Sequence, residues 1–202
     1  NYFMRIALIA SAQNMPFSHH DENEVQIVCF NEFKDIGDLK QYDALIHFGF
    51  DPHLENYGSI KIPVFIDSVS QTLAGNSLPE NVVRMNGWPG FVEKPIWEIS
   101  GAVSPAHQQV MTALGKQWIV VPDMVGFVSC RVIAMIINEA FFAVESGVSS
   151  EADINTAMRL GTNYPFGPFE WADLIGRKEL FQLLKLLAAS DARYTPCPAL
   201  MK

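Results

Sequence analysis

Short apolar runs alternate with polar segments through the first 123 residues. A short apolar run bounded by turn-forming residues is typical of a buried strand, and its repetition predicts an α/β sheet. Segments 33–42 and 104–117 have helical spacing and predict crossover helices, whereas 11–24 contains Pro16 and predicts a loop or at most a short helix. We expect strands at residues 5–10, 25–30, 44–50, 63–68, 81–86 and 118–123.

The pattern changes to long helices after Asp123. Residues 125–145 carry apolar side chains on nearly every helical face, which predicts a helix at the centre of a bundle or at an interface between subunits. Gly147 is placed to end this helix. We therefore expect two domains, a sheet domain over 1–123 and a helical domain over 124–202.

Capping residues predict where the later helices begin and end. Ser150 is a typical N-cap with Asp153 three residues further on, and Gly161 is the expected end of that helix. Pro168 favours a first helical position and opens a further expected helix over 169–189.

Composition indicates a folded chain with real cores, because 49% of its residues are hydrophobic. The net charge is −8, and 14 of the 22 acidic residues lie in 1–123. This balance argues against nucleic acid or an anionic membrane as partner. No signal peptide is visible, and the most apolar stretch, 126–147, contains Arg131 and Glu139, so it predicts a buried helix instead of a membrane span.

The three cysteines are few, odd in number and far apart along the chain. They predict neither a disulfide framework nor a zinc site, and they suit a reducing cytoplasm. The adjacent pair His19 and His20 beside Asp21 suggests metal binding, but neighbouring residues rarely point at one ion. We therefore favour a solvated loop there and expect no metal.

The segment from Val121 onward contains the most specific motifs of the chain. It reads VPDMVGFVSCR, then NEA on the long helix, DINTAMRLG on the next, PFGPFEWADLIG at the following turn and finally RYTPCPALM. These motifs closely resemble the C-terminal domain of the 3-hydroxyacyl-CoA dehydrogenase family. The resemblance implies a shortened Rossmann-like parallel sheet domain followed by a helical dimerisation domain, and therefore a homodimer.

The resemblance extends into the sheet half, where residues 79–101 match a family segment without gaps. The stretch PENVVRMNGWPGFVEKPIWEISG is similar to the family segment that carries its histidine, FIDSVSQT to the strand that ends in its serine, and DALIHFGFD to a further family strand. In the last of these, His47 replaces an acidic residue at a position from which it could reach the cleft. Nearly the whole chain is covered, but the nucleotide part is shorter than usual for the family.

Four side chains of the family act on the reacting oxygen of an acyl-CoA while NAD exchanges a hydride with its C3. A histidine serves as the base, a glutamate orients it, and a serine and an asparagine hydrogen-bond the oxygen. The resemblance places Asn86 at the histidine position, Glu98 at the glutamate, Ser70 at or beside the serine and Cys130 at the asparagine. A carboxamide does not titrate, so Asn86 cannot act as that base.

Each of these residues also has a plain structural interpretation. Glu98 could be an exposed or paired carboxylate on a strand, Ser70 a turn residue, and Cys130 a small apolar residue within a helix. The resemblance alone gives them roles in chemistry.

Cofactor binding rests on the first predicted strand and the turn after it. A dinucleotide pyrophosphate is held by backbone N–H groups of a glycine turn and by a helix N-terminus. Here SAQNMP follows the strand, and the first glycine of the chain is Gly37. Ser11 is the remaining candidate beside the phosphates, and Glu32, after the second strand, is the candidate for the ribose. NAD is therefore the cofactor that the resemblance implies, at a site without its glycines.

Three hypotheses follow. The first is NAD-linked oxidation of a 3-hydroxyacyl-CoA or related small hydroxy substrate, as in fatty acid metabolism, with weak or lost activity. The second is a non-catalytic, degenerate family member that acts as a dimeric acyl-CoA-binding or interaction protein. The third is a reductase of another small substrate that uses a different base.

Overall fold

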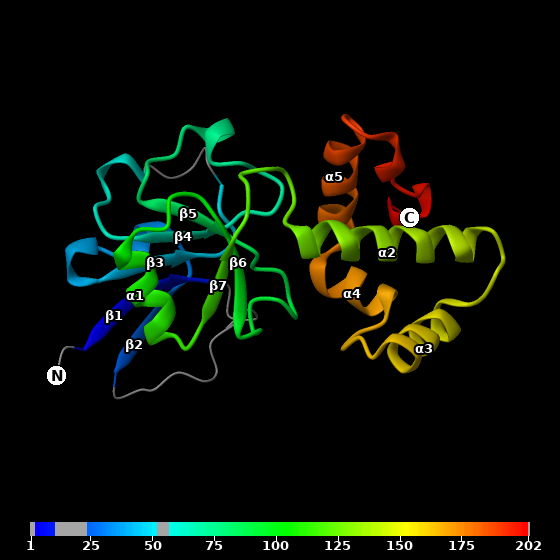
Figure 1. Cartoon of the computed structure of the whole chain (residues 1–202), viewed down its shortest axis with the longest axis horizontal. Helices are drawn as coiled ribbons and strands as arrows, with labels where there is room; N and C mark the ends of the chain where they lie inside the picture. The colour runs from blue at the N-terminus through cyan, green and yellow to red at the C-terminus, as the bar shows by residue number, and fades with distance from the viewer. Residues whose placement is uncertain (1–2, 11–23, 52–56, 202) are drawn as a thin grey trace. The chain divides into compact units, whose positions relative to one another are not determined.

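The computed structural model describes residues 3–10, 24–51 and 57–201 (Figure 1). Within them the chain divides into two compact units. The sheet unit holds residues 1–87 and 91–124, and the helical unit holds 88–90 and 125–202. The assignment of 88–90 to the helical unit was not expected from the sequence. Whether 1–123 and 124–202 act as separate domains stays a prediction.

The sheet unit is a seven-stranded sheet in the order β2-β1-β3-β4-β5-β6-β7. All neighbouring strands are parallel except β5 and β6, which run antiparallel. The strands are β1 (Met4–Ile9), β2 (Val25–Phe30), β3 (Ala44–His47), β4 (Val64–Asp67), β5 (Val82–Met85), β6 (Ile96–Ser100) and β7 (Gln117–Val120). Because β2 and β3 lie on opposite sides of β1, the sheet is doubly wound. This confirms the predicted Rossmann-like α/β fold.

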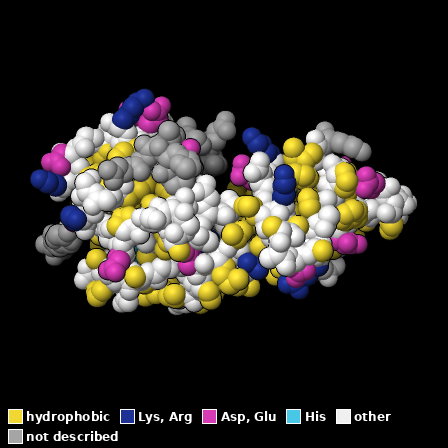
Figure 2. Space-filling view, turned by 90° about the horizontal axis from the view of Figure 1, so that it is seen from above, with side chains coloured by type: hydrophobic (Ala, Val, Ile, Leu, Met, Phe, Trp, Pro, Cys, Tyr) yellow, Lys and Arg dark blue, Asp and Glu magenta, His cyan; other side chains and the backbone are white. Residues whose placement is uncertain are grey.

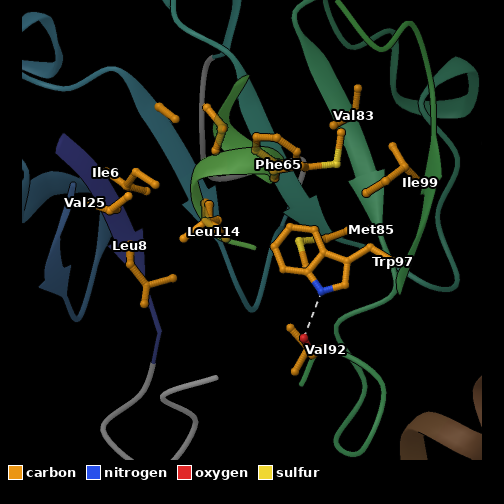
Figure 3. Close-up of a cluster of buried hydrophobic side chains, with 14 of the residues drawn as sticks. Ile6, Leu8, Val25, Phe65, Val83, Met85, Val92, Trp97, Ile99 and Leu114 are labelled. Carbon is orange, nitrogen blue, oxygen red and sulfur yellow. Dashed lines mark hydrogen bonds between the residues drawn. The ribbon is translucent and has the colours of Figure 1, made fainter. Parts of the chain in front are cut away.

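The central strands β1, β3, β4 and β5 are buried on both faces, as continuous apolar strands require. One face packs under α1 (Pro105–Ala113), and Figure 3 shows its central side chains, including Phe65, Met85 and Trp97. The Trp97 indole Nε1 donates to Val92 O at 2.8 Å and so ties the loop before β6 to this core (Figure 3). The opposite face packs against short connections that contain Ile36, Tyr57 and others.

The crossover helix predicted at 33–42 is wrong. Two short 3-10 helices, Phe33–Asp35 and Leu39–Gln41, stand there instead. Gly37 between them has a φ of 71°, which no α-helix accommodates. The helix predicted at 104–117 is confirmed as α1, which Ser104 caps.

The helical unit contains α2 (Val128–Glu145), α3 (Glu151–Thr162), α4 (Pro168–Ile175) and α5 (Arg177–Ala188). The expected ends at Gly147 and the N-cap at Ser150 are confirmed. Gly161 does not end its helix, because α3 continues to Thr162. The single helix expected over 169–189 is two helices, since Gly176 adopts a φ of 101° between them.

Asn138 of α2 holds the C-terminal segment in place. Its Nδ2 donates to Thr195 O at 2.9 Å, and its Oδ1 accepts from Cys197 N at 2.7 Å. The NEA and RYTPCPALM motifs, which are distant in sequence, therefore contact each other through this buried carboxamide.

No helix in the described part of the chain is long and apolar enough to cross a membrane. On the face seen in Figure 2, basic side chains are scattered singly among acidic and apolar ones.

Candidate active site

The antiparallel strands β5 and β6 bring Asn86 and Glu98 together. Asn86 N donates to Glu98 O at 3.2 Å, which places the two residues opposite each other just beyond the end of β5. Their side chains also meet, because Asn86 Nδ2 donates to Glu98 Oε2 at 3.3 Å. Asn86 is buried and Glu98 is half-buried. The structure thus joins two of the residues that the sequence singled out.

In this pair, the Glu98 carboxylate accepts a hydrogen bond from the Asn86 side-chain amide. A carboxylate orients the Asn86 amide as it would orient the N–H of an imidazole. The amide nevertheless neither gains nor loses a proton near neutral pH, so Asn86 can hydrogen-bond a ligand oxygen but cannot accept its proton.

Asp67 and Gly87 set the spacing beside this pair. Asp67 Oδ1, at the end of β4, accepts from Gly87 N at 3.0 Å. A Cβ on Gly87 would lie 2.6 Å from Asp67 Oδ1, so only glycine permits this approach. The carboxyl ends of β4 and β5 are therefore held in contact directly next to Asn86.

Ser70 lies on the half-buried turn that follows β4. Within this turn, Ser68 Oγ donates to Gln71 O at 3.0 Å. Because β4 and β5 are parallel neighbours, with Asp67 opposite Met85, the turn leaves the same edge of the sheet as Asn86.

Cys130 lies in the helical unit, on α2, where it has no exposed surface. In the described part of the chain, Cys130 forms no disulfide with Cys29 or Cys197. The structure places Cys130 in the interior of the helical unit; a role in chemistry stays a prediction.

Sequence reasoning missed Arg84. Its side chain has no exposed surface and forms an ion pair with Asp123, Nη1 to Oδ1 at 2.6 Å. The signal was present in NVVRMN, because a lone charge inside an apolar strand must find a partner if it is buried.

His47 does not reach a cleft, contrary to expectation. It ends β3 with 3% of its surface exposed, and its Nδ1 hydrogen-bonds the Tyr57 hydroxyl at 2.5 Å. The rings of Phe33 and Phe50 pack beside it. Burial lowers the pKa of His47 to about 4, so the imidazole is neutral at physiological pH.

The described residues do not fit NAD in its usual mode. In a doubly wound sheet, nucleotides bind in the crevice beyond the carboxyl ends of the two neighbouring strands at which the strand order changes direction. Here these strands are β1 and β3. His47 and its aromatic neighbours occupy the end of β3, and no glycine occurs in the sequence before Gly37.

Only one of the two residues predicted to contact NAD lies within the described part of the chain. Glu32 is exposed and pairs with Lys34 at 2.5 Å. Ser11 and the expected loop at 11–23 lie outside the described residues.

Among residues 3–10, 24–51 and 57–201, no group of three or more His, Cys, Asp or Glu side chains is arranged to hold a metal ion. The pair His19 and His20 falls outside these ranges.

Comparison with known proteins identifies relatives for both units. The sequence profile of the 3-hydroxyacyl-CoA dehydrogenase C-terminal domain matches residues 126–202. The 3-hydroxyadipyl-CoA dehydrogenase of Escherichia coli (strain K12) is 46% identical over 88 residues, which are 43% of this chain and 18% of that protein. A probable 3-hydroxybutyryl-CoA dehydrogenase of Bacillus subtilis (strain 168) is 41% identical over 142 residues, 66% of this chain and 50% of that protein.

A solved structure resembles the chain over most of its length. The crystal structure of (S)-3-hydroxybutyryl-CoA dehydrogenase from Ralstonia eutropha matches with a TM-score of 0.63 and 24% identity, covering 87% of this chain and 68% of that one. At this identity the likeness shows the fold alone. The chain spans half or less of the length of the two curated relatives above.

Proposed function

Because the chain belongs to the 3-hydroxyacyl-CoA dehydrogenase family, with residues 126–202 as its C-terminal domain, we propose that it binds a 3-hydroxyacyl-CoA or a related small hydroxy substrate and that its NAD-linked turnover is weak or lost. The observation that carries this proposal is the hydrogen bond from Asn86 to Glu98. Asn86 stands where the resemblance implies the base, and Glu98 where it implies the group that orients the base.

Loss of the base affects proton transfer more than binding. General base catalysis contributes on the order of 10²- to 10⁴-fold to a rate. A carboxamide can still donate to a carbonyl oxygen or accept from a hydroxyl group. The site is therefore suited to hold the ligand class of the family and poorly suited to move its hydroxyl proton.

The cofactor is the second reason for weak turnover. NAD is the cofactor of the family, but the described strand ends offer no glycine cradle for its phosphates. We therefore propose no reaction step through NAD, and we expect any binding of NADH to be weaker than in the family's usual mode.

The alternative is a non-catalytic, dimeric acyl-CoA-binding or interaction protein. The favouring observation is the apolar surface of α2, where Val128 is 61% and Val132 is 52% exposed. Figure 2 shows further hydrophobic side chains on the surface of the helical unit. Such a surface is typical of a subunit interface, so we propose a homodimer formed through the helical unit. A cytoplasmic location likewise remains a proposal, based on three cysteines that form no disulfide within the described residues.

Titration calorimetry with acetoacetyl-CoA and NADH, followed by an NADH oxidation assay, tests the proposal. We expect acetoacetyl-CoA to bind and NADH oxidation to be slow or absent. Turnover at a rate typical of enzymes in general, on the order of 1 to 10³ per second, would overturn the proposal of lost activity. Absence of binding by acetoacetyl-CoA would overturn the proposed ligand class.

The Asn86→His variant separates the loss of the base from the loss of the cofactor site. Because both are altered, we expect this variant to remain inactive. Gln108→His, on the exposed surface of α1, is the matched control for an added histidine. Turnover by Asn86→His but not by Gln108→His would show that the base alone is missing and would contradict the non-catalytic alternative.

A further inference from the structure

Arg84 is a fully buried charge within the apolar strand β5. Its guanidinium reaches the turn after β4, where Nε donates to Ser68 O at 2.9 Å and Nη2 to Val69 O at 3.4 Å. Nη1 pairs with Asp123 Oδ1 at 2.6 Å, and Nη2 also donates to Met124 O at 3.1 Å. One side chain therefore joins β5, the turn after β4 and the segment after β7.

Asp123 holds the far side of the same turn. Its Oδ1 accepts from Leu73 N at 3.2 Å and its Oδ2 from Ala74 N at 3.0 Å. Burial would raise the pKa of Asp123, but hydrogen bonds from Ala74, Leu73 and Arg84 outweigh burial and hold this pKa below its ordinary value. The carboxylate is thus charged across the physiological range and remains paired with Arg84.

Ser70 lies between these two anchored points. Arg84 fixes the carbonyls of residues 68 and 69 before it, and Asp123 fixes the amides of residues 73 and 74 after it. Asn86 continues the pairing with β6 just beyond β5, two residues after Arg84, and the two residues therefore face the same side of the sheet. The strand that presents Asn86 to Glu98 thus also sets the path of the turn that carries Ser70.

We propose that the Arg84–Asp123 pair is a positioning device that fixes the Ser70 turn relative to Asn86. A buried ion pair contributes little net stability compared with apolar packing of the same volume, so the geometry that it imposes is its main effect. Arg84 suits this role because its planar guanidinium can hold several acceptors at fixed angles, which a lysine cannot do. The part of the proposal that concerns ligand binding rests on the proposed function; the fixing of the turn does not.

Amide hydrogen exchange tests the fixing of the turn without any ligand. In Asp123→Asn, an amide NH₂ replaces one of the two accepting oxygens, and we expect Leu73 and Ala74 to exchange roughly tenfold faster. Arg84→Lys is the second variant and is expected to loosen the same turn. If the Asp123→Asn protein does not fold, exchange is measured in the Arg84→Lys protein instead. Unchanged exchange at residues 68–74 would overturn the proposal.

Asp191→Asn is the matched control. Asp191 also caps a 3-10 helix, accepting from Arg193 N at 3.0 Å, and also pairs with an arginine, Arg193, at 2.8 Å. It lies in the helical unit, so its substitution should leave exchange at residues 68–74 unchanged. Faster exchange there in the control would mean that the effect is general and not specific to the Arg84–Asp123 pair.

A double-mutant cycle tests whether the contribution of Ser70 to ligand binding depends on the Arg84–Asp123 pair. The measured quantity is the affinity for acetoacetyl-CoA. We expect Ser70→Ala to weaken binding about tenfold in the parent protein but less than about twofold in the Asp123→Asn background. Additive effects would overturn the positioning role, because a purely structural pair would leave the contribution of Ser70 intact. If the parent protein does not bind acetoacetyl-CoA, the proposed function falls, and the exchange experiment alone decides the role of the pair.

Discussion

At the end of β3, the His47 ring stacks against Phe33 with 28° between their planes and hydrogen-bonds the Tyr57 hydroxyl. The sequence left this histidine as a candidate for the cleft, because it replaces an acidic residue of the family, but showed no partner for it. Phe33 and Tyr57 reach it only through the fold, and their packing excludes the water that a protonated imidazole would need.

Burial of His47 predicts a loss of stability in mild acid. Its folded pKa is about 4, against an ordinary value of 6.5. The unfolded chain therefore binds this proton first as pH falls, and stability is lost between pH 6.5 and 4. The loss at pH 4 relative to neutral pH is about 3 kcal/mol.

The His47→Gln variant, which keeps a hydrogen-bonding group for Tyr57, should remove that part of the pH dependence. Denaturant unfolding at pH 4 and pH 7 measures it. A smaller slope remains in the variant, because His107 also has a lowered pKa and Asp123 loses its charge at still lower pH. A slope as steep in the variant as in the parent protein would contradict the assignment to His47.

Among the elements, α3 and α4 show how glycines that look alike in sequence differ in the fold. Gly161 lies on the exposed surface of α3, where an added Cβ would have no other atom within 4 Å. Gly167, just before α4, lies so close to α3 that a Cβ would be 2.6 Å from Asn155 Cα. Asn155 in turn caps α4, since its Oδ1 accepts from Phe169 N at 3.0 Å.

Opposite effects are therefore expected for alanine at these two glycines. Gly167→Ala should destabilise the helical unit by about 1–3 kcal/mol, because α3 and its cap on α4 must move apart. Gly161→Ala should stabilise it by up to about 1 kcal/mol, because alanine favours the helix and meets no neighbour. Thermal unfolding of the two variants checks both signs, and a loss of stability in Gly161→Ala would argue against the helical conformation at that position.

For the whole molecule, the apolar surface of α2 bears on the oligomeric state. Val132→Glu places a charge in the middle of that surface and should shift the proposed dimer to monomer in sedimentation velocity measurements. Val148→Glu is the control, because Val148 is 73% exposed but lies beyond the end of α2. A parent protein that sediments as a monomer would refute the dimer. An equal shift from dimer to monomer in both variants would mean that the interface is not formed by α2 in particular.

Local pattern predicted the elements whose residues interact mainly with near neighbours. The apolar runs of β1 to β5 and the capping residue Ser150 are of this kind, because strand burial and helix capping depend on a few adjacent residues. The helix expected at 33–42 failed because Gly37 adopts a positive φ that the apolar spacing around it did not reveal.

The sequence by itself determined the two-part character of the chain, its family and the absence of a titrating group at Asn86, because these depend on residue identity and spacing. Only the tertiary structure decided that Asn86 bonds Glu98, that His47 is buried beside Tyr57 and that Arg84 joins the Ser70 turn to Asp123. Each of these contacts joins residues 10 to 39 positions apart in the chain. Distances between such residues are set by strand order and by the paths of the connections, which no local pattern of side chains contains.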